Sequence, residues 1–232
     1  MKNPKKILII IQRSNGDVLL SETLINALYE YYDSPEIDLL VNDDTFHVAE
    51  LLSNVSYIHQ FSYQNKQNNR WLQEKRLISS IFRKYDLSIN LTASDRSVLY
   101  AIIASSQSIS AIENNNNKSW WKKIFLYKFY YFDNRRHILI NNLESLQLLK
   151  IKHKRIQKSP KVSNSILLKM KKKLESKGIN EFFIFHPSGQ YSYKIYPRHL
   201  RDELLRYLSK LDIPILITGS NSEIDSNIKK EL

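Results

Sequence analysis

Apolar runs and amphipathic stretches alternate along the first half of the chain. Short continuous apolar runs are typical of buried parallel strands, and apolar repeats at intervals of three and four residues are typical of helices. The runs predict strands at Lys6–Ile11, Glu36–Val41, Tyr57–Phe61, Leu87–Leu91 and Ser108–Ile112. The repeats predict helices at Val18–Tyr32, Thr45–Leu52, Trp71–Lys84 and Arg96–Ser105. This alternation indicates a parallel sheet covered by helices on both faces.

The pattern changes after the fifth predicted strand and then restarts. An aromatic, lysine-containing segment, Trp120–Phe132, follows an Asn-rich loop, and a further helix is predicted at Leu143–Ile151. The stretch 152–164 is charged and aperiodic, which is typical of an interdomain linker. Beyond it the pattern predicts a helix at Ser165–Lys177, a strand at Phe182–Phe185, a helix at Pro197–Leu211 and a strand at Pro214–Ile217.

These elements group into two domains of unequal size. Residues 1–151 form a doubly wound, Rossmann-like N-terminal domain, and residues 165–232 form a second Rossmann-like domain with only two predicted strands. A doubly wound domain usually has about five or six strands. We therefore expect an α/β architecture of two Rossmann-like domains in which the second domain is incomplete.

Charge and composition narrow the classes of function. Lys and Arg number 35 against 23 Asp and Glu, which gives a formal net charge of +12. This charge favours anionic partners such as phosphorylated substrates, nucleic acid or an anionic membrane surface, and a lysine-biased composition explains it equally well. Cysteine is absent, so disulfides and thiolate metal sites are excluded, which fits a cytoplasmic protein. We expect no transmembrane helix, because no run of about 18 apolar residues occurs. We expect no signal peptide, because charge returns at Arg13 and Asp17 and no small-residue cleavage site is present.

The turn after the first predicted strand is the first candidate for chemistry. It reads Arg13-Ser-Asn-Gly-Asp17, and Gly16 is expected to allow a tight turn. Asp17 falls at the start of the next helix, where the helix dipole favours negative charge. A carboxylate base in the ligand crevice and an ordinary N-cap aspartate both fit this position, and spacing alone favours the cap.

The loop between the predicted strand Phe182–Phe185 and the helix that starts at Pro197 is the second candidate. Ser188 and Gly189 are small, so backbone N–H groups there are accessible, and Lys194 adds a positive charge near the start of the helix. Such a loop is suited to hold a diphosphate. A solvated loop with a surface lysine is the alternative, and the position after a strand slightly favours the binding role.

These motifs, in this order and spacing, resemble the ADP-heptose:lipopolysaccharide heptosyltransferases, glycosyltransferase family 9. The resemblance is carried by the first strand with Arg13 to Asp17, by His186-Pro-Ser-Gly with Lys194 and Pro197, and by Ile215-Leu-Ile-Thr-Gly-Ser-Asn-Ser-Glu223. The segment Leu51–Ile58 also resembles the region after the family's second helix. The family's chains continue further, so we expect a second domain that is truncated relative to theirs.

The resemblance implies a GT-B fold, with an N-terminal domain that takes the acceptor and a C-terminal domain that takes the nucleotide-sugar. It implies an inverting transfer of heptose from ADP-heptose to a lipopolysaccharide or lipooligosaccharide core, without a metal or other cofactor. Asp17 would deprotonate the acceptor hydroxyl, and Lys194 would offset the charge that grows on the leaving diphosphate. By the same resemblance, substrate binding involves Arg13, Gly16, Ser188, Gly189, Gly219 and Glu223.

Other interpretations of the sequence remain open. A catalytically inactive remnant that binds the acceptor or a partner protein is the main alternative to an active enzyme. A nucleic-acid-binding module is disfavoured, because the basic residues are dispersed and no reader motif occurs. The segment Trp120–Phe132 fits an aromatic helix packed between the domains better than a helix on an anionic membrane surface. A lipid-linked acceptor would nevertheless suit a cytoplasmic enzyme that is peripheral to the inner membrane. The histidines show no metal-ligand spacing.

Overall fold

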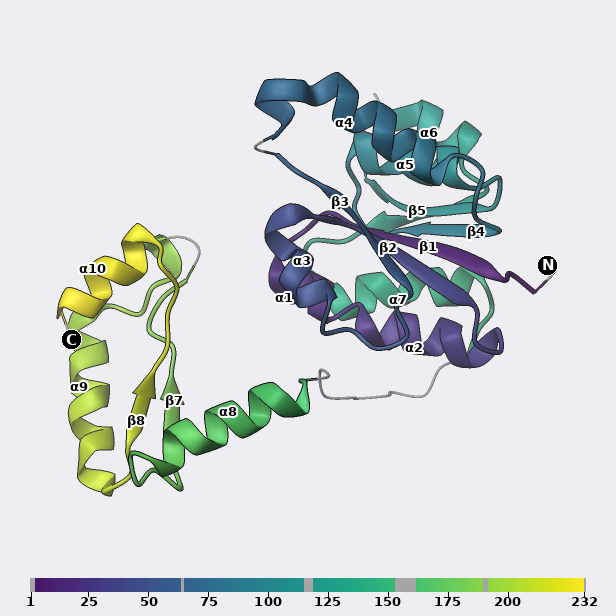
Figure 1. Cartoon of the computed structure of the whole chain (residues 1–232). Coiled ribbons are helices and arrows are strands. Elements are labelled where there is room, and N and C mark those ends of the chain that lie inside the picture. The colour runs from purple at the N-terminus through teal and green to yellow at the C-terminus, as the bar shows by residue number, and fades with distance from the viewer. Residues whose placement is uncertain (1–2, 64, 115–118, 153–161, 190–191, 232) are drawn as a thin grey trace. The chain divides into compact units, whose positions relative to one another are not determined.

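The computed structural model describes residues 3–63, 65–114, 119–152, 162–189 and 192–231, with residues 65–69 as backbone only. The chain divides into two compact units, Met1–Lys161 and Val162–Leu232 (Figure 1). The division falls within the stretch 152–164 that the sequence analysis assigned to a linker.

Six parallel strands form the sheet of the first unit, in the order β3-β2-β1-β4-β5-β6. They are β1 (Lys6–Ile11), β2 (Glu36–Asn42), β3 (Tyr57–Phe61), β4 (Leu87–Asn90), β5 (Ser108–Glu113) and β6 (Lys128–Phe132). The first five match the predicted strands to within one residue at each end. The order reverses between β1 and β4, and ligands of doubly wound folds bind at the carboxyl ends of the strands at such a reversal.

Helices cover both faces of this sheet, as Figure 1 shows. One face carries α1 (Asn15–Leu19), α2 (Glu22–Tyr31), α3 (Phe46–Ala49) and α7 (Ile138–Leu148), with the short 3-10 turn Asp43–Thr45 before α3. The opposite face carries α4 (Asn65–Ile81), α5 (Asp95–Ala104) and α6 (Trp120–Phe125).

The first strand is buried on both sides, which explains its continuous apolar run. Ile7, Ile9 and Ile11 pack with residues of α2, α3 and α7. Leu8 and Ile10 pack on the other side with residues of α4 and α5. Burial of each such side chain contributes about 1.5–3 kcal/mol, so β1 anchors the centre of the sheet.

The helix predicted at Val18–Tyr32 is two helices. The Ser21 hydroxyl donates to the Val18 carbonyl at 2.6 Å, a local bond of the kind that competes with the regular helical ladder. The chain therefore breaks between α1 and α2. The first helix starts earlier than predicted, with Ser14 at its N-cap, so Asp17 lies in the first turn of α1 and is not its cap.

The aromatic segment Trp120–Phe132 is not one helix. It folds as α6 followed by β6, and β6 pairs with β5 from Ile109↔Lys128 to Glu113↔Phe132. Aromatic residues favour strands where a neighbouring strand is available. The sequence analysis missed this sixth strand because its partner, β5, lies on the far side of the Asn-rich loop and α6.

The second unit is small. Its sheet has two parallel strands, β7 (Phe183–Phe185) and β8 (Ile215–Ile217), as predicted. Its helices are α8 (Asn164–Glu175), α9 (Arg198–Leu208) and α10 (Glu223–Glu231), with 3-10 turns at Ser192–Lys194 and Ser209–Leu211. Gly178 follows α8 with φ of 67°, a conformation that glycine adopts without strain. Among the described helices of both units, none has the length and apolar character needed to cross a membrane.

Candidate functional site

Arg13 and Asp17 form an ion pair at the carboxyl end of β1. The Arg13 Nε donates to Asp17 Oδ2 at 2.9 Å, and both side chains are partly exposed. The guanidinium carbon of Arg13 lies 4.6 Å from the ring centroid of Phe132, at the end of β6. Burial, with a smaller effect of Glu144, raises the pKa of Tyr130 on β6, and the nearby Arg13 charge opposes this rise. Arg13 thus links β1 to β6 and holds Asp17 at the strand reversal.

Gly16 lies in α1 beside this pair. A Cβ added at Gly16 would have no heavy atom within 4 Å, and its φ is not positive. The prediction that Gly16 serves a tight turn is therefore wrong, because the residue is helical and does not need glycine's conformational freedom. The space beside Gly16 is open to solvent.

Two buried polar groups at this edge have no hydrogen-bond partner among the described residues. They are Nε2 of Gln12, which follows β1, and Oδ1 of Asn42, which ends β2. Their residues are 9% and 8% exposed. The last residue pair between β1 and β2 is Ile11↔Val41. Gln12 and Asn42 each come directly after that pair, at the carboxyl ends of neighbouring strands. Because buried polar groups are usually paired, this donor and this acceptor are suited to receive hydroxyl groups of a ligand.

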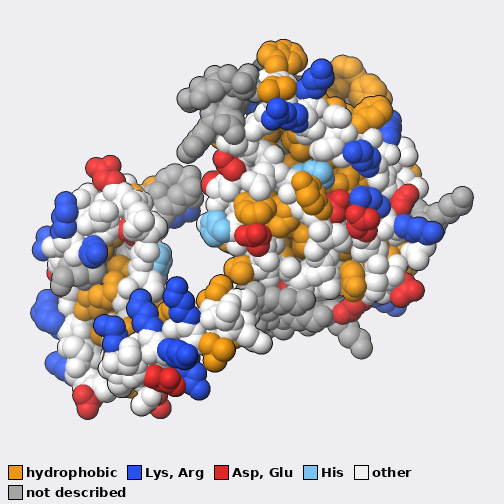
Figure 2. Space-filling model, viewed as in Figure 1, with side chains coloured by type: hydrophobic (Ala, Val, Ile, Leu, Met, Phe, Trp, Pro, Cys, Tyr) orange, Lys and Arg blue, Asp and Glu red, His pale blue; other side chains and the backbone are white. Residues whose placement is uncertain are grey.

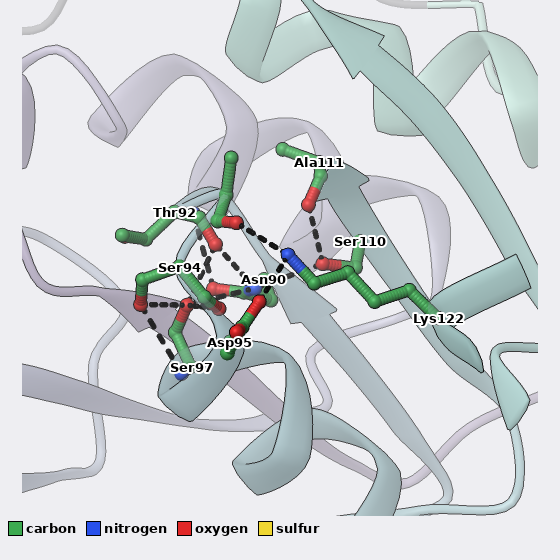
Figure 3. A network of polar contacts seen from close by, with 9 residues as sticks. Asn90, Thr92, Ser94, Asp95, Ser97, Ser110, Ala111 and Lys122 are labelled. Atoms are coloured by element: carbon green, nitrogen blue, oxygen red, sulfur yellow. Dashed lines mark hydrogen bonds and ion pairs between the residues drawn. The ribbon is translucent and has the colours of Figure 1, made fainter. Parts of the chain in front are cut away.

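A hydrogen-bonded network fixes the loop that follows β4, on the other side of the reversal (Figure 3). The Gln12 backbone N–H donates to Thr92 Oγ1 at 3.0 Å, which joins this loop to the end of β1. Asn90 donates to the Thr92 carbonyl at 2.6 Å and to Ser110 Oγ at 2.8 Å. Ser94 caps α5 by accepting from the Ser97 N–H. The loop is therefore hydrogen-bonded to Gln12, the residue before Arg13.

Lys122 reaches this network from α6. Its ammonium group donates to the Ala93 carbonyl at 3.1 Å and pairs with Asp95 Oδ1 at 2.6 Å, and its side chain is fully buried (Figure 3). The sequence analysis favoured an aromatic helix packed between the domains for Trp120–Phe132 and did not single out Lys122. The structure turns Lys122 inward onto the β4–α5 loop of the first unit.

The predicted diphosphate loop of the second unit is joined to the loop after β8. His186 Nδ1 and Thr218 Oγ1 lie 3.1 Å apart, and His186 Nε2 and Ser188 Oγ lie 3.3 Å apart. The Ser188 hydroxyl also helps to lower the pKa of Asp225, in the segment after β8. Because β7 and β8 are parallel neighbours, the loops at their carboxyl ends meet at one edge, as in the first unit.

Asp225 is the carboxylate that organises this edge, and the sequence analysis did not single it out. Its Oδ2 accepts from the Ser220 N–H at 2.6 Å, from the Ser220 hydroxyl and from the Ser222 hydroxyl at 3.1 Å. The hydroxyls of Ser188 and Ser220 hold the pKa of Asp225 well below its usual range. Glu223, the predicted substrate-binding residue, is the exposed first residue of α10.

The remaining predicted residues of the second unit lie around the same loops. A Cβ on Gly219 would approach Asp225 Cγ to 3.3 Å, so only glycine fits there easily. A Cβ on Gly189 would lie 3.5 Å from the Lys194 Cβ, which places Gly189 against Lys194. The Lys194 side chain is exposed, with Nζ 5.7 Å from the Tyr193 ring centroid.

A pocket of about 430 Å³ opens at this edge. Gly219, Ser220 and Asp225 line it together with Lys229 of α10. Backbone N–H groups, hydroxyls and a lysine are groups that bind phosphate oxygens. Within the described residues, no group of three His, Asp or Glu side chains is placed to hold a metal ion.

The predicted site residues thus fall into two sets. Arg13, Gly16 and Asp17 gather at the reversal of the large sheet in the first unit. Five others gather at the carboxyl edge of the small sheet in the second unit: Ser188, Gly189, Lys194, Gly219 and Glu223.

Solved glycosyltransferase structures share the fold of this chain. A family 9 glycosyltransferase from Veillonella parvula DSM 2008 superposes with a TM-score of 0.80 at 16% identity, over 96% of this chain and 64% of that one. The fold is that of the heptosyltransferases. E. coli heptosyltransferase WaaC with ADP gives a TM-score of 0.72 at 16% identity over 97% of this chain and 70% of that one. E. coli ADP-heptose lps heptosyltransferase II gives a TM-score of 0.70 at 16% identity, over 98% of this chain and 69% of that one.

Sequence comparison adds no family assignment, because neither a family model nor a curated protein matches the chain. The structural likeness confirms the α/β, GT-B-like fold class that the sequence predicted. The chain spans 64% of the length of the Veillonella parvula structure, so the likeness is one of fold over that part.

Proposed function

We propose that this chain is a glycosyltransferase that moves a sugar from a nucleotide-sugar to a hydroxyl acceptor. One observation carries the proposal: the Arg13–Asp17 pair lies at the strand reversal of a sheet whose fold is that of the heptosyltransferases. In that position a carboxylate meets the ligand in doubly wound folds. The accessible space at Gly16 and the unpaired amide groups of Gln12 and Asn42 support an acceptor site there.

Asp17 is the base in this proposal. Arg13 holds Oδ2 at 2.9 Å, which leaves Oδ1 to accept the proton of the acceptor hydroxyl. The acceptor oxygen attacks the anomeric carbon of the donor, and the bond from that carbon to the diphosphate oxygen breaks. The electron pair leaves on the diphosphate, the proton remains on Asp17, and the configuration of the sugar inverts.

The loops of the second unit take the diphosphate in this proposal. Lys194, the hydroxyl of Ser188 and the backbone beside Gly189 offset the charge that develops on the leaving group. The motif resemblance and the ADP in a WaaC structure of the same fold support an ADP-linked heptose as donor. A lipopolysaccharide-type glycolipid core is the matching acceptor, since one E. coli structure of this fold is an ADP-heptose lps heptosyltransferase.

Nucleotide binding is the first test of this function. Titration calorimetry of the full chain with ADP should show binding, and Lys194→Ala should weaken it at least tenfold, because a charge-assisted contact to phosphate is lost. Lys210→Ala is the matched control, since Lys210 is an exposed lysine of the same unit in the turn after α9. The absence of ADP binding at millimolar concentration would contradict the proposal.

Sugar transfer is the second test. With ADP-heptose and a core acceptor, Asp17→Asn should lower kcat by about 10²–10⁴-fold, because general base catalysis is lost. Its affinity for ADP should stay within about twofold of the unaltered chain. Asp44→Asn, an exposed carboxylate after β2, should leave kcat unchanged. Equal losses of ADP affinity and of transfer in Asp17→Asn would show that Asp17 is not the base.

A further inference from the structure

The helix α4 exposes a second apolar side to solvent. Its inner side is conventional, with Leu77 and Ile81 buried against β1. On the outer side Trp71 is 87% exposed and Phe82, just after the helix, is 60% exposed. Leu72 is exposed as well. A contiguous patch of large, solvent-exposed apolar side chains indicates an interaction surface.

The apolar surface continues from α4 onto the neighbouring helix. A groove of about 720 Å³ runs between α4 and α5, and its apolar walls include Trp71, Ile78 and Leu99. A shallower hollow of about 1040 Å³ follows α4 itself from Trp71 to Phe82. Figure 2 shows hydrophobic side chains with Lys and Arg between them at the top of the first unit, over its upper helices.

The same surface is rich in positive charge. Exposed cations flank the apolar side chains along α4 and its C-terminal end: Arg70, Lys75, Arg76, Arg83 and Lys84. Between Asn65 and Lys84 the only acidic residue is Glu74. Its carboxylate accepts from the Tyr100 hydroxyl at 2.5 Å and pairs with Arg96 at 3.7 Å, so it does not neutralise the flanking cations.

We propose that this α4–α5 surface docks on an anionic lipid bilayer. Aromatic and aliphatic side chains flanked by Lys and Arg are the composition of helices that lie in the membrane interface, where rings enter the headgroup region and cations bind lipid phosphates. The helix α6, on the same face of the sheet, exposes Trp120, Ile124 and Phe125. The sequence analysis considered membrane contact for Trp120–Phe132, but the continuous groove with flanking charge lies on α4 and α5.

This inference does not depend on the proposed function, because no residue of the catalytic proposal belongs to the surface. The test is sedimentation of the full chain with vesicles of phosphatidylcholine alone or mixed with phosphatidylglycerol. We expect binding to the mixed vesicles, weaker binding in high salt, and little binding to phosphatidylcholine alone.

Two double variants separate the apolar and the charged contributions. One variant combines Trp71→Ala with Phe82→Ala, and the other combines Lys75→Gln with Arg76→Gln. Each should lower the partition coefficient between buffer and the mixed vesicles by roughly an order of magnitude or more. All four side chains are exposed, so the fold should persist, which circular dichroism checks. Tyr31→Ala is the matched control, because Tyr31 is an exposed aromatic residue on α2, across the sheet.

Three results would overturn the proposal. They are equal binding to neutral and anionic vesicles, unchanged binding by both double variants, and a dimer in sedimentation velocity that Trp71→Ala dissociates. The last result would assign the surface to a second copy of the chain. ADP affinity and sugar transfer to a soluble acceptor should stay unchanged in both double variants, so failure here is distinguishable from failure of the proposed function.

Discussion

Asp225 shows how one carboxylate organises two loops. Its Oδ2 accepts from Ser220 and Ser222, after β8, and the Ser188 hydroxyl, after β7, helps to lower its pKa. These donors stabilise the ionised form, so the pKa of Asp225 lies below that of an unfolded chain. The loops that carry the proposed diphosphate site therefore depend on this negative charge.

Acid should destabilise this edge of the second unit. A carboxylate with a lowered pKa contributes its full stabilisation above the unfolded pKa of about 3.9 and loses it as the pH falls toward the folded value. The protection factors of amides in the segments 186–189 and 218–222, measured by NMR and corrected for intrinsic exchange rates, should fall below about pH 4. Asp225→Asn should exchange rapidly at neutral pH already and show a flatter acid dependence. Glu223→Gln is the control. Its amide exchange should depend on pH in the same way as that of the unaltered chain.

At the scale of elements, α6 stabilises the β4–α5 loop through Lys122. The buried ammonium group satisfies the Ala93 carbonyl and pairs with Asp95, whose side chain is 73% exposed. Removing one member of a buried pair is very destabilising when it leaves the other charge buried. Here the carboxylate that remains would be solvated, so a smaller loss is expected.

Substitution of Lys122 should separate its charge from its packing. We expect Lys122→Met to lower the free energy of unfolding by about 1–2 kcal/mol, because the Ala93 carbonyl loses its donor while most of the volume is kept. Lys122→Ala should lose about 2–4 kcal/mol, because a cavity is added. Urea unfolding measures both values. Lys123→Met, at an exposed neighbour, should stay within about 0.5 kcal/mol of the unaltered chain, and an equal loss there would contradict the assignment.

At the scale of the whole molecule, the two units differ in how much they bury. The three main core clusters all lie in the first unit, where the strands of the sheet are covered on both faces. In the second unit Ile184 and Ile217, both on strands, are 66% and 47% exposed, and its buried side chains include Arg201 and Ile228. Stability follows buried apolar area, so it should be unevenly distributed.

Hydrogen exchange should reveal this difference. In mass-spectrometric exchange of the full chain, we expect peptides from β1 and β4 to be protected for hours and those from β7 and β8 to exchange at least a hundredfold faster. The edge strand β3 is the control for edge effects, and it should exchange more slowly than β8. Equal protection of β8 and β1 would contradict the uneven distribution.

Many elements of the fold were predictable because their signals are local. The runs at Ile7–Ile11 and Leu39–Val41 are apolar because both faces of those strands are covered. Elements whose formation depends on distant partners were missed or misjudged. The strand β6 is an example, since it exists through its pairing with β5. The break at Ser21 was missed for a different reason, because apolar periodicity does not show the local bond from the Ser21 hydroxyl to the Val18 carbonyl.

The alternation of strands and helices, and the placement of Arg13 and Asp17 directly after the first strand, could be predicted from the amino-acid sequence. These features depend on apolar periodicity and on neighbours a few residues apart, which a single sequence contains. The strand order, the inward orientation of Lys122, the role of Asp225 and the apolar, basic surface of α4 became known from the three-dimensional structure. Each of these depends on which distant segments pack together, and packing free energy is shared among residues far apart in the chain.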